Sequence, residues 1–88
     1  PPVYFKGLPR PRIISYVSTA DGRPANGTVE VREGDTVIGS AKVRFGLASV
    51  TLTGKLTRGT HTYTVTFVPS DANSVGGSTD TAKLIVLF

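Results

Sequence analysis

The sequence contains one histidine, His61, and no cysteine. The lack of cysteine excludes thiolate zinc sites, disulfides and cysteine nucleophiles. His61 has no carboxylate beside it in the sequence, and a lone histidine without an orienting partner is not a catalytic triad. We therefore expect His61 to be a structural residue, and we assign no catalytic, cofactor-binding or metal-binding residue to this chain.

Carboxylates are the other groups that can do acid–base or metal chemistry. Most of them fall at turns or on the polar faces of strands, whereas glycoside hydrolysis needs two that flank a cleft. Residues 71–76 match the start of a calcium loop, D-x-N-x-x-G, but Val75 offers no side-chain ligand and Ala82 stands where a bidentate Glu is needed. We expect a turn there, and a weak calcium site that uses Asp71, Asp80 or Asp21 stays open. The six carboxylates are Asp21, Glu30, Glu33, Asp35, Asp71 and Asp80.

The net charge is +4, and its distribution matters more than its size. Residues 1–12 carry Lys6, Arg10 and Arg12 with no acid, so the rest of the chain is nearly neutral. Nucleic-acid binding needs a stripe of basic residues on the folded face, with aromatic side chains interleaved among them for single strands. The sequence shows neither feature. We interpret residues 1–12 as a solvated basic leader and expect no nucleic-acid partner.

Aromatic side chains give little support for a sugar-stacking platform. The chain has no tryptophan. The strand pattern predicts that Tyr63 and Phe67 are buried and that Tyr16 alone faces outward from its strand. Contacts to a glycan would then have to come from loops.

Residues 60–67 give the clearest secondary-structure signal. Threonine stands at every second position, and the positions between hold His61, Tyr63, Val65 and Phe67. Strict alternation over eight residues predicts a half-buried strand with its threonines toward solvent.

Further β-rich segments are separated by Gly, Pro, Asn and Asp clusters, and no segment has a helical period. We expect an all-β sandwich of about seven short strands.

The 88 residues suffice for one domain, and no apolar run approaches the roughly 20 residues of a transmembrane helix. We divide the chain into a Pro-rich connector at 1–12, in which Val3–Lys6 can form a short edge strand, and a domain at 13–88 that we expect to be monomeric. Strands are predicted at 13–18, 28–32, 36–43, 48–53, 60–67 and 82–88. The residues expected to face inward are Ile13, Ser15, Val17, Val29, Val31, Ile38, Ala41, Val43, Ala48, Val50, Leu52, Leu56, Tyr63, Val65, Phe67, Leu84 and Val86.

Four stretches, in order along residues 13–86, resemble the bacterial immunoglobulin-like repeat found in tandem in bacterial surface and secreted proteins. They are DGRPANGTV at 21–29, VIGSAKV at 37–43, LTRGTHT at 56–62 and FVPSDAN at 67–73. The resemblance implies an immunoglobulin-like Greek-key sandwich of two antiparallel sheets. It also implies an extracellular or cell-surface location and places His61 in the fold signature. Ser74-Val75 departs from the family, which often has an aromatic residue there.

The function follows from an expectation about the chain ends. An odd number of antiparallel strands places the termini at opposite poles, so modules join end to end and each adds roughly 35 Å. A proline-rich connector would stiffen such a joint. We expect a non-catalytic spacer that displays neighbouring domains of the same chain.

Other functions stay open at this point. The loops at 20–26 and 70–78 could bind a surface glycan or a host protein, which would make the domain an adhesion module. The domain could instead be an accessory part of a secreted hydrolase. A Lys–Asn isopeptide crosslink is a further minor alternative.

Overall fold

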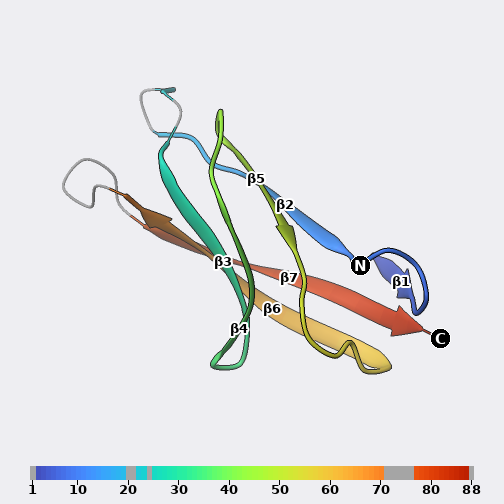
Figure 1. The fold of residues 1–88 in the computed structure, drawn as a ribbon. Helices are drawn as coiled ribbons and strands as arrows, with labels where there is room; N and C mark the ends of the chain where they lie inside the picture. The colour runs from blue at the N-terminus through green and yellow to red at the C-terminus, as the bar shows by residue number, and fades with distance from the viewer. Residues whose placement is uncertain (1, 20–21, 24, 71–76, 88) are drawn as a thin grey trace.

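The computed structural model describes residues 2–19, 22–23, 25–70 and 77–87, which form seven strands and no helix (Figure 1). The strands agree with the predicted segments to within a few residues, and the all-β fold class is confirmed. The edge strand expected near the N-terminus is present. The strands are β1 (Val3–Phe5), β2 (Arg12–Tyr16), β3 (Gly27–Glu33), β4 (Thr36–Lys42), β5 (Leu47–Thr51), β6 (Gly59–Pro69) and β7 (Ser78–Leu87).

The strands form two sheets of unequal width. The larger has the order β1-β7-β6-β3-β4, and the smaller contains β2 and β5 alone. The two-stranded sheet has few backbone bonds of its own, and such ribbons are marginal without a packing partner. Its inner side chains, Ala48 and Val50 among them, are buried in the common core.

Strand β6 is central, because β3 and β7 flank it on both sides. The predicted alternation is confirmed: His61, Tyr63 and Phe67 are buried, while Thr60 and Thr62 are exposed. The remaining threonines of the strand are half-buried, since β3 and β7 both run beside that part of β6.

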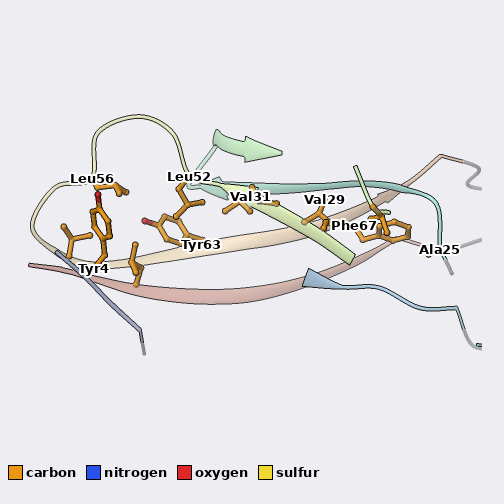
Figure 2. Close-up of a cluster of buried hydrophobic side chains, with 13 residues drawn as sticks. Tyr4, Ala25, Val29, Val31, Leu52, Leu56, Tyr63 and Phe67 are labelled. Carbon is orange, nitrogen blue, oxygen red and sulfur yellow. The ribbon is translucent and has the colours of Figure 1, made fainter. Parts of the chain in front are cut away.

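The core runs the length of the sandwich (Figure 2). Every residue predicted to face inward is buried or packed against the core, except Ser15, which is half-buried. Tyr4 and Ala25 are buried members that the sequence pattern did not predict. Tyr4 stands at one end of the core beside Leu56, and its burial shows that part of residues 1–12 belongs to the folded body.

The expectation that the two chain ends lie at opposite poles is wrong for the described residues. Strand β1 pairs with β7 in parallel, at the last three positions of β7's register, Ile85 to Leu87. The Ile85 amide donates to the Pro2 carbonyl at 3.0 Å, and the Lys6 amide donates to the Leu87 carbonyl at 3.0 Å. The opposite-pole rule assumes a first strand as long as the sandwich, and β1 has only 3 residues. Both described ends therefore lie side by side (Figure 1).

The connection between β4 and β5 is a tight turn at Phe45-Gly46. Arg44 and Leu47 exchange both backbone hydrogen bonds, at 2.8 and 3.0 Å. Both turn residues have positive φ, 54° at Phe45 and 74° at Gly46, which is the conformation of a type I′ hairpin turn. Glycine accepts this region freely, whereas phenylalanine in it is unusual.

Candidate functional site

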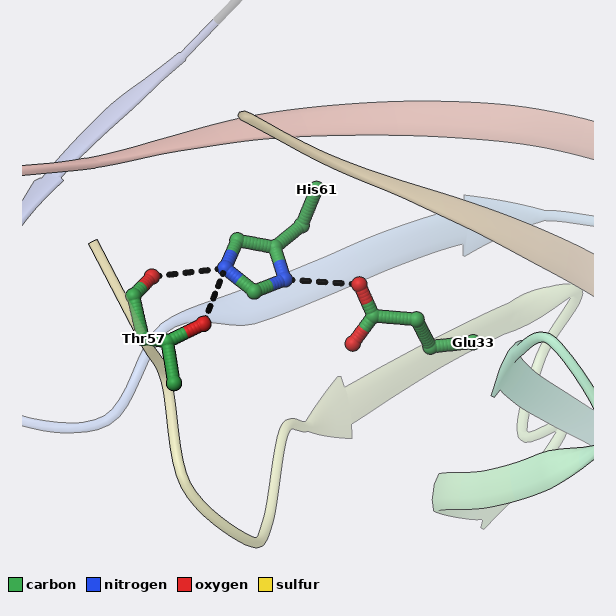
Figure 3. Close-up of polar contacts among 3 residues, drawn as sticks. All are labelled: Glu33, Thr57 and His61. Carbon is green, nitrogen blue, oxygen red and sulfur yellow. Dashed lines mark hydrogen bonds and ion pairs between the residues drawn. The ribbon is translucent and has the colours of Figure 1, made fainter. Parts of the chain in front are cut away.

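The described residue best equipped for chemistry, His61, lies near the start of β6 and bridges two other segments (Figure 3). Its Nδ1 is 2.6 Å from Oε2 of Glu33, at the end of β3. Its Nε2 is 2.6 Å from the carbonyl oxygen of Thr57, in the segment between β5 and β6. The ring also stacks on Tyr63, with the centroids 6.0 Å apart. Sequence analysis missed the carboxylate, because Glu33 is 28 positions away.

Both ring nitrogens face oxygen acceptors, an arrangement that the doubly protonated imidazolium satisfies because it donates from both nitrogens. The Thr57 carbonyl makes the largest contribution to raising the pKa of His61 above its usual 6.5. Burial opposes it, and the hydrogen bond and charge of Glu33 act with the carbonyl to raise the pKa. The site therefore favours a charged histidine that anchors β3 and the 52–58 segment to β6.

The three residues Thr57, His61 and Glu33 have the composition of a hydroxyl–histidine–carboxylate triad. In such a triad the ring nitrogen facing the hydroxyl must accept its proton. Here the Nε2 hydrogen is donated to the Thr57 carbonyl at 2.6 Å, while the Thr57 hydroxyl is farther away at 3.4 Å. The nitrogen has no lone pair directed at the hydroxyl, so the geometry suits an anchor and does not suit activation of a nucleophile.

The basic N-terminal segment is also bound to the body of the domain. Arg10 donates from Nε to the Leu52 carbonyl at 2.8 Å and from Nη2 to the Gly54 carbonyl at 2.6 Å. The Tyr4 hydroxyl donates to the Leu8 carbonyl at 3.0 Å. Arg10 is exposed, as expected of a solvated segment, but its side chain is also hydrogen-bonded to the body of the domain. Both carbonyls lie more than 40 residues away in the chain, so the local sequence pattern could not predict these bonds.

The structure describes only some of the remaining predicted positions. Asp21 and Asp71, with the whole calcium-loop match at 71–76, lie outside the described residues, and so do parts of the two candidate binding loops. Asp80 accepts a hydrogen bond from the neighbouring Thr81 amide at 2.8 Å. Within the part of the chain that the structure describes, no three His, Cys, Asp or Glu side chains are grouped to hold a metal ion. Tyr16 is 81% exposed, as predicted, while Tyr63 and Phe67 are buried.

The family follows from a model of the bacterial Ig-like domain (group 3), which matches residues 12–86, most of the chain and the whole span from β2 into β7. This chain is a bacterial Ig-like domain. The resemblance read from four short stretches is thereby confirmed. Comparison of this Ig-like domain with curated proteins and with solved structures gave no significant match. Across its described residues, the Ig-like domain has no helix with the length and hydropathy needed to cross a membrane.

Proposed function

We propose that this Ig-like domain is a non-catalytic structural module of a bacterial surface or secreted protein, where it holds neighbouring domains of the same chain. Family membership supports a structural role. The anchoring hydrogen bonds of His61 agree with it, since they occupy both nitrogens of the only histidine. The body is elongated, with extents of 43 × 23 × 19 Å, and its long dimension exceeds the roughly 35 Å expected from the strands together with the loops at both poles.

The parallel pairing of β1 with β7 is the observation that carries this proposal. A pull that separates Pro2 from Leu87 draws β1 backward and β7 forward along their common direction. The bonds from Ile85 to Pro2 and from Lys6 to Leu87 are then loaded in shear and share the force. A module held this way resists tension at its ends even though those ends lie near each other.

Single-molecule force spectroscopy tests the proposal, with the domain pulled through two different pairs of positions. Pulling at Pro2 and Leu87 loads β1 and β7 in shear. Pulling at Gly59 and Leu87 opens the antiparallel β6–β7 pair from its end, one hydrogen bond after another. We expect a clearly higher unfolding force for the first pair. An equal or lower force would reject a tension-bearing role.

The other functions expected from the sequence gain no support from the described residues at the positions predicted for them. The loops at 20–26 and 70–78 are expected as alternatives for binding a glycan or host protein, and residues 20–21, 24 and 71–76 of them lie outside the described residues. An accessory role beside a catalytic domain depends on the flanking sequence of the parent protein. Intact mass measurement distinguishes an isopeptide crosslink, because the loss of ammonia lowers the mass.

A further inference from the structure

A hollow of about 500 Å³ lies between the segment that follows β1 and the segment that precedes β6. Its volume is within the roughly 300–1,000 Å³ typical of ligand sites. Four basic residues line it, Lys6 and Arg10 from the first segment and Lys55 and Arg58 from the second, and none of its lining residues is acidic. The fold has brought four of the ten basic residues of the chain around one depression, although the two groups are far apart in sequence.

One basic side chain of the hollow, that of Arg10, is held in place by the protein. The two hydrogen bonds of Arg10 to the carbonyls of Leu52 and Gly54 hold the guanidinium in one orientation. A guanidinium has five N–H groups, so two bonds to the protein leave others to donate to a ligand. The planar, fixed group is suited to oxygens of phosphate, sulfate or carboxylate.

Two of the four basic side chains, Lys6 and Lys55, carry charge that no described acidic group pairs with. Glu33 approaches this region, but it does not line the hollow and its carboxylate is paired with His61 at 2.6 Å. Basic side chains grouped on one concave surface raise the local concentration of anions. They therefore attract a ligand that carries several negative charges.

We propose that this hollow binds an anionic carbohydrate, a sugar or polyol chain that bears phosphate, sulfate or carboxylate groups. Thr57, Gly7 and Gly54 line the same surface, and hydroxyl and main-chain groups suit the hydroxyls of such a chain. Single-stranded nucleic acid is disfavoured because it needs exposed aromatic faces, and the only aromatic residue in the lining, Tyr4, is 9% exposed. The proposal does not depend on the mechanical role proposed above.

Titration of the intact domain with a sulfated heparin hexasaccharide, followed by amide NMR shifts, tests this site. We expect shifts at residues 6–10 and 54–58, and a binding constant that falls about tenfold between low and physiological salt. Lys6→Gln and Lys55→Gln should each weaken binding by about threefold to tenfold. Lys42→Gln and Lys83→Gln remove the same charge from exposed positions outside the hollow, and we expect each to stay within about twofold of wild type.

Three further probes decide the class of ligand. A glycerol phosphate oligomer should bind at the same residues, and an uncharged dextran oligosaccharide should not bind. Tighter binding of an oligothymidylate of equal charge, or of phosphatidylglycerol vesicles, would overturn the carbohydrate assignment. The site itself would be rejected by the absence of shifts at millimolar hexasaccharide, or by an equal effect of all four lysine substitutions. Melting curves of each variant establish that it is folded.

Discussion

Nδ1 of His61 lies 2.6 Å from Oε2 of Glu33, and this contact joins the start of β6 to the end of β3 across 28 positions of sequence. With the Thr57 carbonyl on the opposite nitrogen, the ring connects three segments at the end of the sandwich that also holds β1. Both ring nitrogens of the imidazolium donate short hydrogen bonds of 2.6 Å, and hydrogen bonds from a charged donor are among the stronger ones in proteins.

The raised pKa of His61 predicts a pH-dependent stability. Because the folded-state pKa exceeds the unfolded value near 6.5, the native state binds the proton more tightly. The stabilisation is fully present below pH 6.5 and is lost as the pH rises through the folded pKa. Chemical denaturation between pH 5.5 and 9 should therefore show a falling free energy of unfolding.

His61→Gln provides the control, since it should remove this slope. Glu33→Gln should reduce the slope and cost about 0.5–1 kcal/mol near pH 6, because Glu33 is partly exposed and solvent screens the pair. A wild-type stability that rises with pH across this window would contradict the assignment.

Two tyrosine hydroxyls should respond in opposite ways to removal. Among the described residues, the Tyr63 hydroxyl is buried without a hydrogen-bond partner, whereas the Tyr4 hydroxyl donates to the Leu8 carbonyl. Tyr63→Phe removes an unsatisfied polar atom, so we expect no loss, or a gain of up to about 1 kcal/mol. Tyr4→Phe breaks a hydrogen bond and should cost about 1 kcal/mol. Urea denaturation measures both, and a loss of more than about 1 kcal/mol in Tyr63→Phe would show that the hydroxyl has a partner.

The turn residue Phe45 should be replaceable with a gain in stability. Its φ of 54° is strained for a residue with a bulky side chain, and the side chain is fully exposed, so no contact offsets the strain. Phe45→Asn should raise the free energy of unfolding by about 1 kcal/mol, because asparagine tolerates this region. Phe45→Ala retains the Cβ and should change little. A destabilised Phe45→Asn variant would mean that the phenylalanine makes a stabilising contact.

The strand pattern was readable from the sequence because it is local. In β6 the alternation of threonine with larger side chains reports directly which face is buried, and tertiary contacts reinforce that choice. The same logic identified nearly the whole core. The burial of Ala25 was not predicted, because this residue lies outside any strand and no periodicity marks it as buried.

The functional contacts were not readable, since each joins segments that are distant in the chain. Nothing in the residues around His61 points to Glu33, and nothing around Arg10 points to the carbonyls of Leu52 and Gly54. The prediction that the chain ends lie at opposite poles was wrong for a related reason. Strand count alone does not state how far the first strand extends, and a strand as short as β1 leaves Pro2 beside Ile85.

The parallel β1–β7 pairing is the centre of the functional account, and one substitution tests it directly. Lys6→Pro removes the amide that donates to the Leu87 carbonyl, while Lys6→Ala keeps it and removes the same charge. With the domain pulled through Pro2 and Leu87, the account predicts a lower unfolding force for Lys6→Pro and an unchanged force for Lys6→Ala. Equal forces for the two variants would contradict it.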